Sequence, residues 1–213
     1  MKGMVTAVAV WLLLMAGAAS AAPRSQGQAG EFDFYVLSLS WSPTFCLTNP
    51  TDQQCTGKGY GFVLHGLWPQ YARGGWPASC APQSRLSHEE VAKGMSLFVT
   101  EKLLRHEWAK HGTCSGLEPS VYLDKTDAAL GVVKVPESLQ PLNAPTYLQA
   151  REIENLFRQS NPAMGNHGMA VICKGKQLSE VRVCLSKDLQ FAGCPRSVKT
   201  QCREGEVRIP AQR

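Results

Sequence analysis

The sequence predicts a single exported domain of the α+β class. Its 213 residues are the usual length of one domain. Its 44% hydrophobic and 18% charged residues are typical of a globular rather than a disordered chain. Segments with strand-like and helix-like patterns are mixed along the chain without regular alternation, which favours an α+β over an α/β arrangement.

The first 22 residues are predicted to be a secretory signal peptide. Lys2 supplies a positive charge, residues 5–19 are nearly all apolar, and residues 19–22 are small enough for signal-peptidase cleavage. The apolar run is short for a bilayer, which disfavours the alternative of an uncleaved membrane anchor. Residues 23–213 then form the single mature domain, in which we find no further membrane-spanning pattern.

Two strands are predicted at the start of the mature domain. Residues 32–41 alternate in part between apolar and polar side chains, as a strand does. Residues 46–61 hold a proline and several glycines and are predicted to form a loop. Residues 61–67 are predicted to form a buried strand that Pro69 ends. A second loop, rich in proline and glycine, follows over residues 74–84.

Four helical stretches are predicted next. Ser87 is followed three residues later by a glutamate, which is a capping-box pattern, and the helix that it starts breaks near Gly94. A second helix is predicted over residues 99–111 and stops at a glycine. Residues 120–130 and 146–159 are further helix candidates.

A hairpin is predicted near the C-terminal end of the domain. Residues 169–173 and 180–185 are both rich in apolar and β-branched side chains. They lie on either side of Gly175, which indicates two strands joined by a longer loop.

The cysteines indicate a disulfide framework. Eight remain in the mature chain, an even number in an exported protein, which predicts four disulfides. No two cysteines have the Cys-x2-Cys spacing that is usual for metal binding. The sequence alone leaves about 105 pairings open. The net charge of +5 favours an anionic partner such as nucleic acid, although no run of Lys and Arg is present.

Two short segments carry most of the chemistry: residues 63–69 (Val-Leu-His-Gly-Leu-Trp-Pro) and residues 106–114 (His-Glu-Trp-Ala-Lys-His-Gly-Thr-Cys). They contain three of the five histidines, beside a glutamate, a lysine and two tryptophans. Imidazoles exchange protons near neutral pH, and neighbouring cations suit an anionic, phosphate-like transition state. The two segments together predict a metal-independent site that cleaves phosphodiesters.

Helical geometry places the polar residues of the second segment on one face. At about 100° per residue, four polar side chains fall within about 140° of arc: His106, Glu107, Lys110 and His111. Trp108 and Ala109 are expected to turn away toward the core. In the first segment Leu64 is expected to point into the core, so that His65 points out of it. The other two histidines, His88 and His167, are interpreted as structural or surface residues.

An exported zinc hydrolase is the main alternative of another class. Zinc proteases use His-Glu-x-x-His, with the ligands four residues apart. Here the second histidine is five residues on, so that the rings diverge by about 140° instead of about 40°. His65 could still complete a site with His106 and His111, so this alternative stays open.

The two segments resemble the active-site segments of the ribonuclease T2 family, in the same order and at a similar separation. Residues 35–43 are similar to that family's first strand and residues 178–184 to a late strand; the resemblance is weakest over residues 115–165. It implies a central, mainly antiparallel sheet flanked by helices. It also implies endonucleolytic cleavage of single-stranded RNA with little base specificity, to a 2′,3′-cyclic phosphate and then a 3′-phosphate, without a metal or other cofactor.

The resemblance also implies a role for each site residue. His65 would be the general acid for the departing 5′-oxygen and His111 the general base for the 2′-hydroxyl, although these two roles can be exchanged. Glu107 and Lys110 would stabilise the phosphorane, and His106 would hold the phosphate.

Base binding would fall to Trp68 and Gln70. Trp68 matches a residue that stacks on the base 5′ to the cleaved bond. Gln70 stands where some family members have an acidic residue that contacts the base, so the base preference stays open. A non-catalytic relative is a further alternative, but such proteins commonly lose an active-site histidine, and this chain keeps all three.

The family pattern further implies four disulfide pairs: Cys80–Cys114, Cys173–Cys202, Cys184–Cys194 and, as a local loop, Cys46–Cys55. RNA is the expected partner. We expect a monomer in the periplasm or the medium, with no membrane association.

Overall fold

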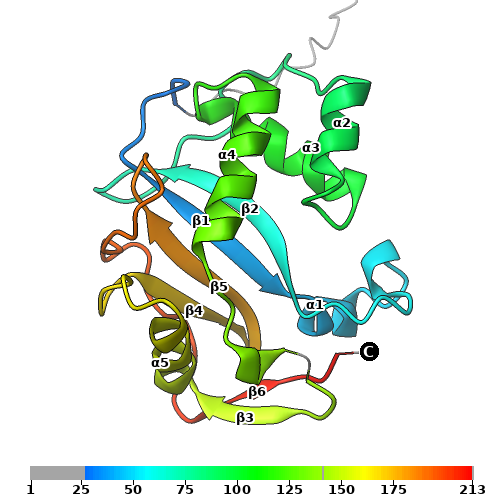
Figure 1. Cartoon of the computed structure of the whole chain (residues 1–213), viewed down its shortest axis with the longest axis vertical. Helices are drawn as coiled ribbons and strands as arrows, with labels where there is room; N and C mark the ends of the chain where they lie inside the picture. Colours follow the sequence, from blue (N-terminus) through cyan, green and yellow to red (C-terminus); the bar gives the residue numbers. More distant parts are fainter. Residues whose placement is uncertain (1–26, 141, 213) are drawn as a thin grey trace, which may run out of the picture.

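A six-stranded sheet crosses the centre of the molecule (Figure 1). The computed structural model describes residues 27–140 and 142–212, so the predicted signal peptide lies outside the described residues. In chain order the helices and strands are β1 (Phe34–Trp41), α1 (Ser42–Thr48), β2 (Phe62–Gln70), α2 (His88–Gly94), α3 (Glu101–Lys110), α4 (Pro119–Val132), β3 (Thr146–Gln149), α5 (Ala150–Ser160), β4 (Met169–Lys174), β5 (Gln177–Leu185) and β6 (Glu206–Ile209).

The sheet is mainly antiparallel. Its strand order is β2-β1-β5-β6-β3, with β4 paired to β5; among the strand pairs of the described residues only β5 and β6 are parallel. Helices α2, α3 and α4 pack together beside β2, whereas α5 lies at the other end of the sheet against β3 and β4 (Figure 1). The predicted α+β class with helices flanking an antiparallel sheet is therefore confirmed.

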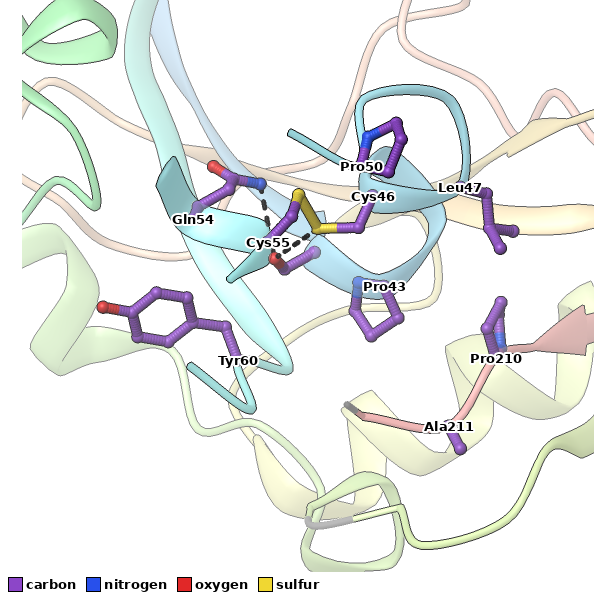
Figure 2. A pocket seen from close by; sticks show the side chains of 10 residues that line it. Pro43, Cys46, Leu47, Pro50, Gln54, Cys55, Tyr60, Pro210 and Ala211 are labelled. Carbon is purple, nitrogen blue, oxygen red and sulfur yellow. Dashed lines mark hydrogen bonds between the residues drawn. A yellow bond between two sulfur atoms is a disulfide. The ribbon is translucent and has the colours of Figure 1, made fainter. Parts of the chain in front are cut away.

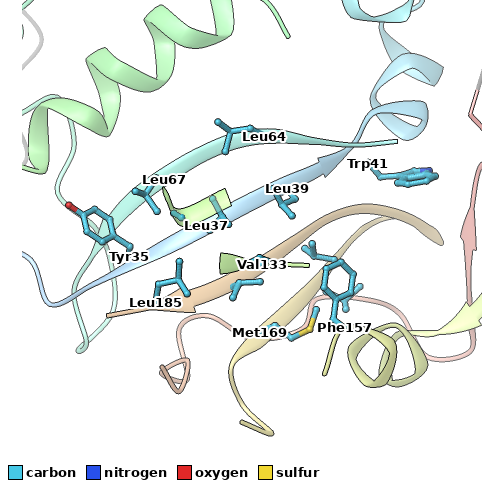
Figure 3. Close-up of a cluster of buried hydrophobic side chains, with 14 of the residues drawn as sticks. Tyr35, Leu37, Leu39, Trp41, Leu64, Leu67, Val133, Phe157, Met169 and Leu185 are labelled. Carbon is cyan, nitrogen blue, oxygen red and sulfur yellow. The ribbon is translucent and has the colours of Figure 1, made fainter. Parts of the chain in front are cut away.

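Strand β1 is buried on both faces. Tyr35, Leu37 and Leu39 point to the same side, where Figure 3 shows them with Leu64 and Leu67 of β2 in the main apolar core. A strand places alternate residues on opposite faces, so the other face of β1 carries a second set of side chains. That smaller cluster contains Phe34 and Val36 of β1 and Trp68 of β2. The functional site described below is built on this second face.

Strand β2 runs past Pro69, where the sequence predicted its end. Pro69 pairs with Tyr35 and the strand continues to Gln70. The prediction was wrong because β2 is the edge strand of the sheet and pairs only with β1. On an edge strand the missing N–H of proline can face away from the partner without the loss of a ladder hydrogen bond.

Three other segments also differ from the prediction. Residues 42–48, part of which was predicted as loop, form α1, which has a proline at its start. The first four residues of the predicted helix 146–159 form β3, which pairs with β6, a strand that the sequence analysis missed. The helix α5 starts only after Gln149, whose side chain shares a capping box with Glu152.

The hairpin of β4 and β5 is tighter than expected. Lys174 pairs directly with Gln177, so that only two residues make the turn. Gly175 adopts a φ of 63°, in the left-handed region that favours glycine. The capping box at Ser87 is present as predicted, and α4 spans slightly more than the predicted 120–130.

All four disulfides pair as the family resemblance implied: Cys46–Cys55, Cys80–Cys114, Cys173–Cys202 and Cys184–Cys194. Among the residues with described positions no cysteine is left free. In the same part of the chain, we find no helix with the length and apolarity needed to span a bilayer.

Candidate active site

A β-bulge presents His65 to the surface of the sheet. Ser38 of β1 pairs with Gly66, but the next residue, Leu39, pairs with Leu64, so that His65 is the extra residue of β2. A bulge bends the strand locally and re-aims the side chain that it carries. Leu64 is buried in the core as predicted, and the His65 side chain keeps 34% of its surface exposed.

Gly66 allows β2 to approach α3 closely. A Cβ atom at this position would overlap the carboxylate of Glu107 and the indole nitrogen of Trp68. Only a residue without a side chain fits between these groups. The glycine after His65 is therefore required by the contact between the two segments that the sequence analysis singled out.

Helix α3 carries the second segment in its last turns. Thr100 caps its start by accepting a hydrogen bond from the N–H of Leu103, and the helix ends at Lys110 with His111 as its cap. Trp108 packs into the core, as predicted. Ala109 does not: it is exposed, because the core reaches only the Leu104–Trp108 side of the helix.

The structure brings all seven predicted site residues to one cavity of about 270 Å³. These residues are His65, Trp68, Gln70, His106, Glu107, Lys110 and His111. The cavity is completed by Val36 of β1, by Arg182 of β5, and by loop residues that include Trp76 and Ser197. The other two histidines, His88 and His167, are exposed and lie outside it, in agreement with their interpretation.

Trp68 forms the centre of the site rather than an open platform. Its indole nitrogen donates a hydrogen bond of 2.6 Å to Glu107. Its ring stacks on His111, with centroids 5.1 Å apart, and meets the His65 ring edge-on at 5.0 Å. Arg182 lies over the same indole, 5.3 Å from its centroid. With 9% of its surface exposed, Trp68 mainly packs against the other side chains of the site.

His65 lies between two carboxylates. Its Nδ1 donates a hydrogen bond of 2.9 Å to Glu180, and its Nε2 is 3.6 Å from Glu107. Burial acts to lower the pKa of His65, but the hydrogen bond with Glu180 and the charges of both carboxylates outweigh burial, so the net pKa is raised. His65 is thus favoured in its protonated form.

His111 has the opposite tendency. Burial, followed by the charges of Lys110 and His106, lowers the pKa of His111 from 6.5 to about 3. Burial and the charge of Lys110 also lower the pKa of His106. The cavity therefore holds one imidazole that favours the proton and one that favours the neutral form, which suits an acid and a base that act together.

Three residues of the site were missed by the sequence analysis. Trp76, in the loop after β2, is 52% exposed and is the most accessible aromatic side chain of the cavity. Glu180 and Arg182 stand two apart on β5 and hence on one face of the sheet. Two charged residues at this spacing in a strand whose second half is otherwise apolar are the signal that would have found them.

A second cavity, between α1 and the C-terminal segment, differs in its chemistry (Figure 2). Its walls include Pro43, Leu47 and Pro210 beside the Cys46–Cys55 disulfide. No carboxylate, histidine, lysine or arginine lines it. Nowhere in residues 27–140 and 142–212 do three or more His, Cys, Asp or Glu residues form a group that could hold a metal ion.

Comparison with known proteins identifies the family of the chain. The model of the Ribonuclease T2 family matches residues 32–194. A ribonuclease of Aeromonas hydrophila is 49% identical over 105 residues, which span 49% of this chain and 48% of that protein. Ribonuclease 3 of Arabidopsis thaliana is 30% identical over an alignment that covers 87% of this chain and 92% of the plant protein.

Solved structures show the same fold. The crystal structure of RNase NT in complex with 5′-AMP superposes with a TM-score of 0.63 at 26% identity. The superposition covers 85% of this chain and 99% of the other. Since the family model covers most of the chain and includes both histidine-bearing segments, the chain belongs to the ribonuclease T2 family of endoribonucleases.

Proposed function

We propose that the protein cleaves single-stranded RNA without a metal, by transphosphorylation to a 2′,3′-cyclic phosphate followed by hydrolysis to a 3′-phosphate. The observation that carries this proposal is the pair of imidazoles with opposite pKa shifts in one cavity, His65 raised and His111 lowered. The 2′-hydroxyl of RNA is the nucleophile, so neither a covalent enzyme intermediate nor a metal-activated water is required.

In the first step His111 accepts the proton of the 2′-hydroxyl while the 2′-oxygen attacks phosphorus. The bond from phosphorus to the 5′-oxygen breaks, and His65 donates its proton to that oxygen. A base with a pKa of about 3 is weak in the empty site, but the negative charge of a bound phosphate raises the pKa of a neighbouring imidazole. In the second step the roles reverse. His65 accepts a proton from water, whose oxygen attacks phosphorus, and the bond from phosphorus to the 2′-oxygen breaks as His111 returns its proton to that oxygen.

The charge that develops on the phosphorane is met by three groups. Lys110 and His106 line the same cavity and supply hydrogen-bond donors to the phosphoryl oxygens. Burial raises the pKa of Glu107, despite the charge of His65 and the hydrogen bond from Trp68. The negative charge of a bound phosphate raises this pKa further, so that Glu107 takes up a proton when substrate is bound and donates it in a hydrogen bond to the same oxygens.

Base binding is assigned to Trp68, Gln70 and Trp76. Gln70 is 8% exposed and lines the cavity, and an amide can both donate and accept, so it accepts several bases. Trp68 offers only a small exposed area, whereas Trp76 offers a largely free indole for stacking. Stacking tolerates every base because each has a π-face. The result is weak base preference.

Export to the periplasm or the medium is also proposed. Four disulfides fit an oxidising compartment, and the first 22 residues have the pattern of a signal peptide. In that compartment the protein would act as a monomer on RNA released from cells.

The test is incubation of the purified mature protein with single-stranded RNA and, separately, with DNA of the same sequence, both in EDTA. We expect cleavage of the RNA alone, since DNA lacks the 2′-hydroxyl, and mass spectrometry should find cyclic phosphates that become 3′-phosphates. Cleavage of DNA at a comparable rate would refute the mechanism. Activity that is lost in EDTA and restored by Zn²⁺ would favour the zinc hydrolase, and inactivity under all conditions a non-catalytic relative.

A further inference from the structure

Glu180 is a buried carboxylate that has no role in the proposed reaction. It lies in β5 and only 6% of its surface is exposed. Several residues of the same strand are apolar and fully buried, among them Leu178, Val181 and Val183. A buried charge is costly unless it is paired and hydrogen-bonded. A carboxylate at this position therefore needs partners that compensate for its burial.

Both oxygens of Glu180 are used. One accepts the hydrogen bond of 2.9 Å from Nδ1 of His65, and the other accepts a hydrogen bond from Nε of Arg182. Arg182 is itself fixed over the indole of Trp68 and lines the active-site cavity. The carboxylate is thus held by the arginine in the position from which it contacts the histidine.

We propose that Glu180 is a positioning residue that acts through His65, with Arg182 holding Glu180 in place. The proposal rests on the proposed function, in which His65 is the general acid. A hydrogen bond from Nδ1 to a carboxylate fixes the orientation of an imidazole ring and directs the other nitrogen elsewhere. Here that other nitrogen, Nε2, is on the side of Glu107, in the cavity where the phosphate would lie.

The bulge in β2 explains why His65 needs such a partner. His65 is the extra residue of the strand and has no directly paired residue on β1 to restrict it. Its side chain is one-third exposed, so packing alone does not fix the ring. Glu180, which pairs with Ser40 of β1, reaches across β1 from β5 and is the group that fixes Nδ1.

The negative charge of Glu180 also supports the role of His65 as general acid, because it favours the protonated imidazole. The charged and titratable groups that face His65 are Glu180 and Arg182 from β5, His106, Glu107 and Lys110 from α3, and His111 at the end of α3. Among these, only Glu180 and Glu107 favour the protonated imidazole, and only Glu180 is hydrogen-bonded to it. Loss of the Glu180 charge lowers the pKa of His65, whereas loss of the Arg182 charge raises it.

The test compares Glu180→Gln, which keeps a hydrogen-bonding side chain of the same size and removes the charge, with Arg182→Gln. Titration of the His65 ring nitrogens is followed by 15N NMR in the absence of RNA, and kcat and KM are measured against pH. In Glu180→Gln we expect the midpoint for His65 and the alkaline limb of kcat to move down by about one pH unit. We expect Arg182→Gln to move the His65 midpoint up.

Glu154→Gln is the matched control, because Glu154 is also hydrogen-bonded, to Thr200, but lies on α5 far along the sheet from His65. It should leave both the titration and the pH profile unchanged. In Glu180→Gln, kcat at pH 8 should fall about tenfold, while KM changes less than twofold.

The outcomes separate the two proposals. If Glu180→Gln folds and both the His65 titration and the pH profile match the wild type, the positioning role is refuted. If Glu180→Gln does not fold, Glu180→Asp decides: it keeps the charge but shortens the side chain by one methylene group, so a wild-type His65 titration there refutes the assigned hydrogen bond. If the wild-type protein does not cleave RNA, the proposed function fails, and the NMR titration still decides whether Glu180 controls the protonation of His65.

Discussion

At the scale of single residues, the proposed chemistry depends on two histidines with different surroundings. His65 is placed between carboxylates that favour its proton. His111 is buried beside Lys110, and both the burial and the lysine charge disfavour the protonated form of His111. The sequence identified both histidines, since they lie in two dense polar segments. It did not identify Glu180, because that residue is 115 positions from His65 and only the sheet register brings them together.

We predict that His65→Ala and His111→Ala each lower kcat by at least about 10²-fold, which is the low end for general acid–base catalysis. The double variant should lose less than the product of the two single losses, because the two residues act as a unit. The measurement is steady-state cleavage of a dinucleotide substrate by proteins whose folding has been checked by circular dichroism.

His88→Ala is the control, because His88 is exposed and lies outside the cavity. It should retain near wild-type activity. A folded His65→Ala variant with normal turnover would remove His65 from the chemistry.

At the scale of elements, the site depends on how closely β2 approaches α3. Hydrophobic patterns predict that both elements exist, but they do not encode a bulge or an edge position. For this reason the sequence predicted α3 correctly, but it wrongly predicted that β2 ends at Pro69. Strands β3 and β6 have only four residues each, too few for a clear alternating pattern, and their pairing is non-local.

We predict that Gly66→Ala lowers kcat by at least about tenfold and destabilises the protein by about 1–3 kcal/mol, the usual cost of overpacking. The added methyl group would overlap the Glu107 carboxylate and the Trp68 indole, and so separate β2 from α3. Urea unfolding and kcat measured on the same preparation test both effects.

Gly131→Ala is a suitable control, since a Cβ atom there meets no other atom and alanine is the better helix former within α4. It should leave kcat unchanged and not lower stability. Wild-type kcat in Gly66→Ala would show that the close approach of β2 to α3 is not needed for catalysis.

At the scale of the whole molecule, the two histidine-bearing segments are joined by more than packing. The Cys80–Cys114 disulfide links the loop after β2 to the turn that follows α3, and the family resemblance implied it before the geometry was known. The sheet adds β5 to this arrangement through its pairing with β1. The sequence predicted the domain class. The three-dimensional arrangement adds the reason why the site also affects the stability of the fold: it buries titratable groups such as His111.

The burial of neutral His111 couples the site to the free energy of unfolding. In the unfolded chain this imidazole binds a proton near pH 6.5, whereas in the folded protein its pKa is about 3. The unfolded state therefore binds more protons between these values, and stability falls as the pH is lowered through this window, with a limiting slope of about 1.4 kcal/mol per pH unit. His65 acts in the opposite sense: its raised folded pKa adds stability that is fully present below its unfolded pKa and is lost as the pH rises through the folded pKa.

Below pH 6 the contribution of His65 is nearly constant, and that of Glu180, whose folded pKa is lowered, is lost only as the pH falls below about 4.5. Glu107, whose folded pKa is raised, and His106, whose folded pKa is lowered, also contribute between pH 6 and 4.5, so the slope due to His111 is measured as the difference between the wild type and a His111 variant. We predict that His111→Gln reduces the pH dependence of the unfolding free energy in this window by about 1 kcal/mol per pH unit, as measured by urea unfolding at several pH values. The exposed His88→Gln should leave the slope unchanged. An unaltered slope in His111→Gln would mean that His111 is already protonated in the folded protein, and a protonated His111 could not serve as the base for the 2′-hydroxyl.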